Sequence, residues 1–281
     1  MDNLLPASRP LGPDSILGRL ANDPRIALTG FSTGLLQLMH PAVSAGVMQH
    51  SMFFADPFER VYRSVPRIVA TINATDGADR AVRVRDYHRG IKGTDAHGQR
   101  YHALDPEVFW WTHMTFVWGF LTAADRFHHR PPVGDQRTQF YAESVEWWRR
   151  YGMSMRLVPP TLDAFLQEFE RICAEDLEMT EAAVGALGVG RFELPMLPAP
   201  LARLGGVPSK PVAKLAMLGT LPSSVRRRFE IPWSFADDAA YNLLAQAVRT
   251  GGRIVPDRLS QDVSRVMLKR LGAKTQLASA S

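Results

Sequence analysis

Residues 105–127 read DPEVFWWTHMTFVWGFLTAADRF, the most apolar run of the chain and the stretch that decides its fold. Asp105 is a favoured N-cap residue and Pro106 suits the first turn, so the sequence predicts that a helix begins here. Large apolar side chains fall on all sides of this helix, which predicts that it is buried in a protein core. The run is about the minimum length for a membrane span, but His113, several threonines and the flanking acids favour a buried helix.

His113 is the polar side chain that this run has to accommodate. A buried imidazole without a hydrogen-bond partner is costly, so it needs either a polar neighbour or a metal. One interpretation is a core histidine that donates to a carbonyl at a helix–helix contact, which is the more common case for this residue type. The other is an axial ligand of a haem iron, which a neutral imidazole in an aromatic shell provides. The surrounding tryptophans, and the lack of an acid within one turn, favour the second.

The composition is that of one large globular domain. The chain has 281 residues, of which 46% are hydrophobic and 22% charged, enough to bury a substantial core. The net charge of +5 comes from scattered basic residues whose tightest cluster is Arg226–Arg228, so we expect no nucleic-acid partner. The single Cys173 excludes an internal disulfide and fits a small buried residue in a helix.

The N-terminal residues carry acids and prolines and lack the apolar segment of a signal peptide. We therefore expect a cytoplasmic protein with no integral membrane span. Peripheral membrane contact stays open, because the C-terminal third is basic and rich in leucine.

The pattern along the chain predicts an all-α fold, a compact multi-helix single domain. We expect a loosely structured arm over residues 1–23, a helical domain over 24–258 and a C-terminal helix and tail over 259–281. Proline or acidic residues that open helices predict one starting at Pro41 and another capped by Asp56. Helical stretches are also predicted over 76–88, 105–129, 138–150, 161–187, 212–218, 223–229 and 236–249, with a loop or short hairpin over 90–103.

His88 is a second candidate, because it follows a basic helical segment that contains Arg85. Neighbouring cations and burial both lower a histidine pKa, so a neutral His88 is expected at pH 7. Together with Arg85, one turn earlier, it would form a distal pair that gates dioxygen or a peroxide, or holds a haem propionate. The alternative is an exposed, charged helix end.

The remaining histidines give weaker signals. His40 and His50 are ten residues apart, which is not the spacing of a helical chelating pair. His128 and His129 are expected at a helix C-terminus, where a cation suits the dipole. Nucleophile-elbow, dinucleotide and P-loop motifs are absent, as are the Glu-x-x-His pairs of di-iron bundles.

Three segments carry a resemblance to a known family. They are GLLQLMHPAVSAGVMQHSMFFADPFERVYRS (34–64), YHRGIKGTDAHGQRYHALDPEVFWWTHMTFV (87–117) and LPSSVRRRFEIPW (221–233). In this order they resemble the family that joins rubber oxygenase (latex clearing protein) to the fungal ER-bound oxygenase MpaB, over residues 25–258. The resemblance points to an uncharacterised actinobacterial branch of it.

The resemblance implies an all-helical catalytic domain with a b-type haem between helices, and His113 matches the proximal ligand. Rubber oxygenases have an Arg-x-x-Lys-Thr pattern on the distal side. Here Arg85 matches the arginine and His88 replaces the lysine, while no counterpart of their catalytic glutamate is evident. The resemblance thus implies haem-dependent oxidation of a small apolar substrate by dioxygen rather than polyisoprene cleavage.

We therefore expect a haem b oxygenase or oxidoreductase in which His113 binds iron and His88 and Arg85 line the distal side. Further cofactor-binding candidates are His40, His50, Arg89 and Thr94. Two alternatives stay open: a haem protein without turnover that has His88 and His113 on the iron, and a haem-free helical protein that binds an apolar ligand. An apolar lining is expected from Met48, Met52, Phe53, Phe54, Trp110 and Phe116.

Overall fold

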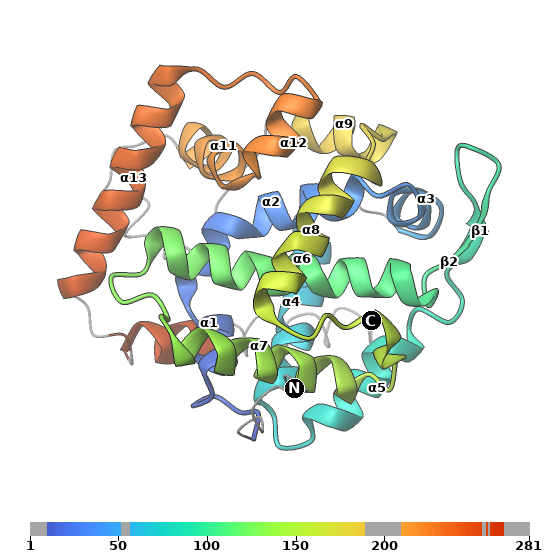
Figure 1. Cartoon of the computed structure of the whole chain (residues 1–281), viewed down its shortest axis with the longest axis horizontal. Coiled ribbons are helices and arrows are strands. Elements are labelled where there is room, and N and C mark those ends of the chain that lie inside the picture. Colours follow the sequence, from blue (N-terminus) through green and yellow to red (C-terminus); the bar gives the residue numbers. More distant parts are fainter. Residues whose placement is uncertain (1–9, 52–56, 189–208, 255–256, 258, 267–281) are drawn as a thin grey trace.

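The computed structural model describes residues 10–51, 57–188, 209–254, 257 and 259–266, and it is all-α apart from one small hairpin (Figure 1). The helices are α1 (Ile16–Ala21), α2 (Ala27–Leu38), α3 (Pro41–His50), α4 (Pro57–Asn73), α5 (Gly77–Asp86), α6 (Pro106–Phe127), α7 (Asp135–Arg150), α8 (Leu162–Glu175), α9 (Glu181–Gly188), α11 (Ser209–Thr220), α12 (Ser223–Arg228) and α13 (Phe235–Ile254). The antiparallel hairpin pairs β1 (Lys92–Thr94) with β2 (Arg100–His102).

Helix α6 lies across the middle of the molecule and forms the centre of the core (Figure 1). It packs against α2, where Trp111 Nε1 donates to the Leu36 carbonyl at 3.2 Å and Thr29 Oγ1 donates to the Gly119 carbonyl at 3.1 Å. A side chain at Gly119 would meet Thr33 Oγ1 at 2.5 Å, so glycine allows the two backbones to approach. The predicted buried helix is confirmed, and it ends at Phe127 rather than His129.

Several predicted boundaries differ for identifiable reasons. The Asp105 carboxylate does not cap α6; it accepts the backbone N–H of His102 instead, at 3.1 Å. The predicted helix over 161–187 is two helices, because the segment between them turns to cap α2. There the Glu178 N–H donates to the Met39 carbonyl at 2.8 Å, and the Thr180 hydroxyl donates to the Leu38 carbonyl at 2.6 Å.

The first residues that the structure describes are ordered. In place of a loose arm, α1 packs into the core with Leu17 and Ala21 fully buried, and residues 259–266 are helical. The opening of α3 by Pro41 and the burial of Cys173 are confirmed. The predicted cap Asp56 lies outside the described residues.

Arginines from elsewhere in the chain satisfy the carbonyls at five helix C-termini. The last carbonyls of a helix have no partner within it, and a cation there also meets the negative end of the helix dipole. The pairs are Arg85 with Tyr151 after α7, Arg150 with Thr71 and Ile72 of α4, Arg226 with Leu218 of α11 and the following Leu221, Arg228 with Cys173 and Glu175 of α8, and Arg249 with Asp125 and Arg126 of α6. Five of the 33 basic residues thus have a structural role at helix ends.

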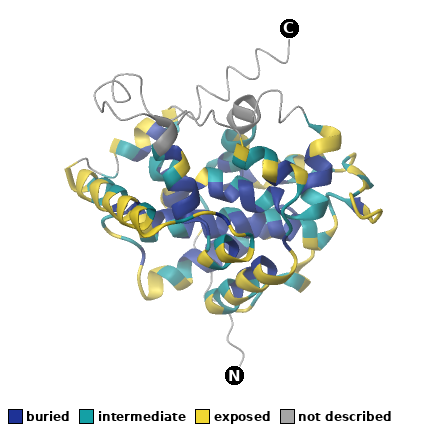
Figure 2. Cartoon of the chain, turned by 90° about the horizontal axis from the view of Figure 1, so that it is seen from above, coloured by how far each residue is buried: buried dark blue, intermediate teal, exposed yellow. Residues whose placement is uncertain are grey.

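Buried residues concentrate along α6 and the faces of α2 and α7 that meet it, while peripheral helices expose their outer faces (Figure 2). Within the described part of the chain, no helix combines the length and apolarity needed to cross a membrane. The burial of α6 side chains in the main core confirms the interpretation of residues 108–124 as a core segment.

Candidate functional site

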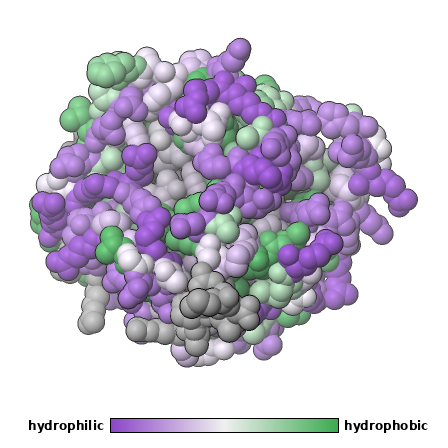
Figure 3. All heavy atoms as spheres, viewed as in Figure 1, coloured by the Kyte–Doolittle hydropathy of each residue, from purple (hydrophilic) through white to green (hydrophobic). Residues whose placement is uncertain are grey.

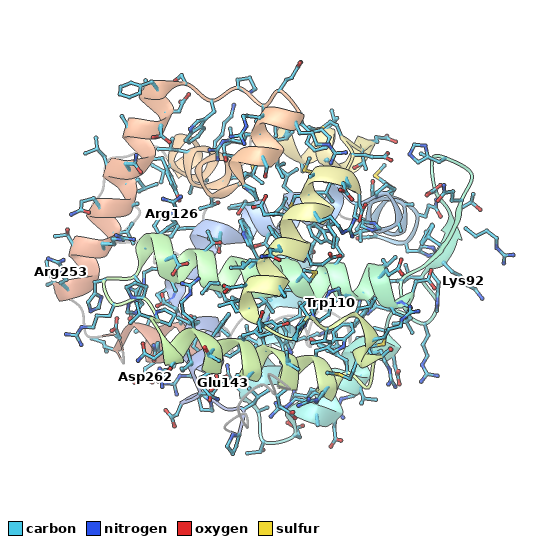
Figure 4. The ribbon with its side chains drawn as sticks, viewed as in Figure 1. Lys92, Trp110, Arg126, Glu143, Arg253 and Asp262 are labelled. Carbon is cyan, nitrogen blue, oxygen red and sulfur yellow. The ribbon has the colours of Figure 1, made fainter. Side chains whose placement is uncertain are left out.

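His113 lies on α6 inside a cage of aromatic rings contributed by α6 and α7. Its ring centroid is 4.5 Å from that of Trp147, 5.2 Å from Trp148 and 5.3 Å from Trp110, with which it stacks, and 6.2 Å from Tyr151. The helical spacing explains the arrangement, because Trp110 precedes His113 by one turn and the α7 residues repeat every three or four positions. Trp110 lies on the part of α6 that passes over α7 (Figure 4).

Neither ring nitrogen of His113 makes a hydrogen bond with any described residue, although the side chain is buried. Burial lowers its pKa to about 3; the backbone of Ser144 opposes this shift without coming into hydrogen-bond geometry. The imidazole is therefore neutral at physiological pH, with a lone pair on one nitrogen. The indole N–H of Trp110 is also buried without a partner, so two unsatisfied polar groups lie side by side on α6.

The α7 side of the cage is fixed by α4. Trp147 Nε1 donates to Thr71 Oγ1 at 2.7 Å, and the guanidinium of Arg150 donates to the Thr71 carbonyl at 2.6 Å. Burial raises the pKa of Tyr151, and hydrogen bonds with Thr71 and Trp147 oppose that shift. The cage walls are thus held in place, whereas His113 is not.

The predicted distal pair lies on α5 and just after it, one layer of side chains away from His113. The ring of His88 contacts Phe109 at 5.6 Å, and Phe109 contacts Tyr151 at 5.3 Å. The Arg85 guanidinium donates to the Tyr151 carbonyl at 3.0 Å and pairs with Asp86 at 2.8 Å. Both residues therefore contact the cage wall and not the His113 ring.

His88 Nδ1 lies 2.8 Å from the Val84 carbonyl. A carbonyl only accepts, so Nδ1 carries a proton and donates it to Val84. This bond fixes the orientation of the His88 ring at the end of α5.

The other predicted cofactor residues lie elsewhere. His50 is exposed, with Nε2 3.1 Å from the Lys92 carbonyl, and Thr94 is on the hairpin, where its carbonyl accepts from Gln49. Arg89 is exposed and pairs with Asp86 at 3.0 Å. His40 is the N-cap residue of α3; burial lowers its pKa, and its Nδ1 has no partner among the described residues. The structure gives none of these four a contact with the His113 ring.

The residues predicted to form an apolar lining do not all lie at the cage. Trp110 stacks on His113, and Phe116 packs against Trp147 at 6.4 Å. Met48 is exposed, and Met52, Phe53 and Phe54 lie outside the described residues.

Sequence reasoning missed Glu143, a fully buried carboxylate on α7. It accepts the backbone N–H of Leu17 at 2.7 Å and the side-chain amide of Gln139 at 3.2 Å, so it joins α7 to the start of α1. Burial raises its pKa. Its position four residues before Trp147, on the face of α7 that meets the core, was the signal available in the sequence.

His128, which was expected to be a cation that suits the dipole at the end of α6, lies in a site that disfavours its charged form. His128 is buried and its pKa is lowered, first by burial and then by the nearby Arg25. Its ring stacks on His129 at 4.8 Å, and Asp257 lies within 3.7 Å of both Nε2 atoms. The carboxylate of Asp257, which is far along the chain, lies beside both rings at the end of α6.

This cluster of His128, His129 and Asp257 offers three atoms that could ligate a metal, but its chemistry disfavours one. His128 Nδ1 accepts the backbone N–H of Arg130 at 2.8 Å, so its Nε2 carries the hydrogen and lacks a lone pair. The Arg25 guanidinium also forms an ion pair with the Asp257 carboxylate, with Nη2 3.1 Å from Oδ1. We interpret the cluster as an ion-pair network.

The comparison with known families matches the chain over residues 18–250 with "ER-bound oxygenase mpaB/B'/Rubber oxygenase, catalytic domain". The chain belongs to this oxygenase family. It is also similar to two mycobacterial proteins, "Uncharacterized protein Mb2261" of Mycobacterium bovis and "Uncharacterized protein Rv2237" of Mycobacterium tuberculosis. Each is 23% identical over 231 residues, covering 80% of this chain and 88% of the relative. No solved structure matches the chain significantly.

Proposed function

We propose that this member of the oxygenase family is a haem b-dependent oxygenase that oxidises a small apolar substrate with dioxygen, and that His113 is the proximal iron ligand. The observation that supports this most is the buried imidazole with two unpartnered nitrogens at the centre of the aromatic cage.

The donor chemistry fits the cofactor. A neutral imidazole is the form that ligates iron, and burial keeps His113 in that form. Bonding to iron would satisfy one nitrogen and leave the other to a second partner, for which the Ser144 backbone is a candidate. Since aromatic rings lie 4.5 to 6.2 Å from His113 on several sides, binding a porphyrin requires part of the cage to move aside.

A bound haem would supply the dioxygen chemistry that no side chain provides. The chain contributes the environment: the tryptophans and Phe109 exclude water and suit an apolar substrate, and the backbone of Tyr151 holds Arg85 at the wall. His88, whose ring is oriented by the Val84 carbonyl and contacts Phe109, is the side chain to which we assign proton transfer on the α5 side of the cage. Arg85, which donates to the Tyr151 carbonyl at this wall, is the candidate partner of a propionate.

The alternative in which both His88 and His113 ligate the iron is less well supported. The rings of Phe109 and Tyr151 lie between these histidines, so His88 reaches the iron only if Phe109 is displaced.

The test is the ultraviolet–visible spectrum of the protein expressed with haem supply, beside His113→Ala and, as a matched control, the exposed His50→Ala. We expect a Soret band that is lost or shifted in H113A and unchanged in H50A. A low-spin spectrum that becomes high-spin in His88→Ala would instead indicate two histidine ligands. No Soret band in the wild type, with retained binding of an apolar fluorophore, would overturn the haem assignment.

A further inference from the structure

The three tryptophans of the cage differ in how their indole N–H groups are satisfied. Trp147 Nε1 donates to Thr71 Oγ1 at 2.7 Å, and Trp148 Nε1 donates to the Ser154 carbonyl at 3.1 Å. The indole N–H of Trp110 is buried and has no acceptor among the described residues. Displacing Trp147 or Trp148 therefore breaks a hydrogen bond, whereas displacing Trp110 breaks none.

Trp110 is enclosed by rings that give its N–H no acceptor. It stacks on His113 at 5.3 Å and meets two rings edge-on, Trp148 at 4.8 Å and Phe165 of α8 at 6.3 Å. On the face seen in Figure 3, hydrophilic side chains predominate and apolar atoms appear between them, but Trp110 lies beneath this surface and is only 4% exposed. A buried donor without a partner costs free energy, so the cage is complementary to a ligand that brings an acceptor.

The charges at the cage wall indicate which kind of acceptor fits. Arg85 donates to the Tyr151 carbonyl at 3.0 Å, and Arg150 donates to the Thr71 carbonyl behind the wall at 2.6 Å. Arg85 pairs with Asp86, whereas Arg150 has no ion pair with a described carboxylate. Since arginine stays charged, this wall has a surplus of positive charge, which favours an anionic oxygen over a neutral one.

We infer that Trp110 is the ring that moves when the cofactor enters the cage, and that its indole N–H then donates to a carboxylate of the cofactor. The inference rests on the proposed function, because haem b carries two propionate groups. Arg85 is the candidate partner of one propionate, which leaves the other for Trp110. Hydrogen bonds to an ionised acceptor are strong, so this bond offsets the loss of the stack on His113.

The test compares haemin with its dimethyl ester, in which neither propionate is ionised. Trp111 gives a matched control, because it is the next residue of α6, is buried, and has its N–H satisfied by the Leu36 carbonyl at 3.2 Å. Titration followed at the Soret band gives the ratio of the two dissociation constants in each protein. We expect Trp110→Phe to lower the preference for haemin at least about tenfold and Trp111→Phe to leave it unchanged.

The haem-free protein gives a readout that does not depend on the cofactor. Both substitutions replace a buried indole by the same smaller ring, but only Trp111→Phe breaks a hydrogen bond. W110F should therefore unfold at a higher urea concentration than W111F.

A further measurement uses the unmodified chain. Zinc protoporphyrin should shift the Trp110 indole N–H signal downfield in the nuclear magnetic resonance spectrum, whereas its dimethyl ester should not.

The outcomes separate this inference from the haem assignment. A Soret band in wild type, with the same preference for haemin in wild type and W110F, overturns the inference and leaves the haem assignment standing. A wild type without a Soret band overturns both. A haem-free W110F that is less stable than W111F also overturns the inference, because it would show that the Trp110 N–H already has a partner.

Discussion

The indole ring of Trp147 lies 4.5 Å from the imidazole of His113, yet its Nε1 donates to Thr71 Oγ1 on α4 at 2.7 Å. A ring that packs against the imidazole without bonding it leaves His113 with van der Waals contacts alone. In the haem-free protein, no hydrogen bond from a described residue offsets the free energy cost of burying the imidazole. This cost can be measured.

We expect His113→Leu to leave the haem-free protein as stable as wild type or more stable by about 1–2 kcal/mol, because it removes unpartnered polar atoms at similar volume. His113→Ala should instead lose about 2 kcal/mol or more through the cavity it creates. Urea unfolding measures both, and both variants should lose haem binding. If H113L unfolds more easily than wild type by about 2 kcal/mol, the imidazole makes a hydrogen bond that contradicts this account.

The arginine that caps α11 gives a second prediction. Arg226 donates to the carbonyls of Leu218 at 2.6 Å and Leu221 at 2.7 Å, and its guanidinium stacks on Trp233 at 4.8 Å. Arg226→Ala should lower the free energy of unfolding by about 2–3 kcal/mol, since it leaves two carbonyls without a charged donor. The exposed neighbour provides the control: Arg227→Ala should change it by less than about 0.5 kcal/mol. Equal effects of the two substitutions would show that net charge, not capping, is what matters.

The helices could be predicted from the sequence because their signals are local. Helix starts are indicated by Pro41 and Pro106. The apolar run around His113 indicates which helix is buried. The capping of α2 by Glu178 and Thr180 could not be predicted, because it joins positions about 140 residues apart. The arginines that donate to helix C-termini could not be predicted either, because their partners are carbonyls of other helices.

Only those parts of the candidate site that residue type and family resemblance indicate could be predicted. His113 stood out by its apolar neighbours, whereas the tryptophans of α7 that complete the cage come from a helix about 35 residues later. The surroundings of His128 and His129 could not be predicted, because Asp257, which lies within 3.7 Å of both Nε2 atoms, is distant in the chain. Glu143 was missed since a single acid in a helix is usually solvated.

Glu143 gives a prediction about pH. Burial raises its pKa above the ordinary 4.5, so the folded protein holds this proton more tightly than the unfolded chain. The stability contributed by the proton is fully present below pH 4.5 and is lost as the pH rises through the folded-state pKa. Glu143→Gln keeps an acceptor for the Leu17 N–H without a titrating group.

The stability of wild type relative to E143Q should therefore fall as the pH is raised above 4.5 and then level off. Thermal unfolding of both proteins across this range measures it. A difference that grows with pH would mean that the carboxylate is stabilised, not penalised, by its site.

Two glycines in helices should respond to the same substitution in opposite directions. A side chain at Gly219 of α11 would meet the ring of Tyr241 at 2.3–2.7 Å, and that ring is fixed in the core beneath α13. Gly219→Ala should therefore push α13 away from α11 and cost about 1–3 kcal/mol. Gly30 of α2 is exposed with nothing within 4 Å, so Gly30→Ala should gain about 0.5–1 kcal/mol from helix propensity.

Denaturant unfolding of G219A, G30A and wild type measures both effects, with intrinsic tryptophan fluorescence as the signal. A G219A variant as stable as G30A would mean that α13 is not packed against α11 through Tyr241.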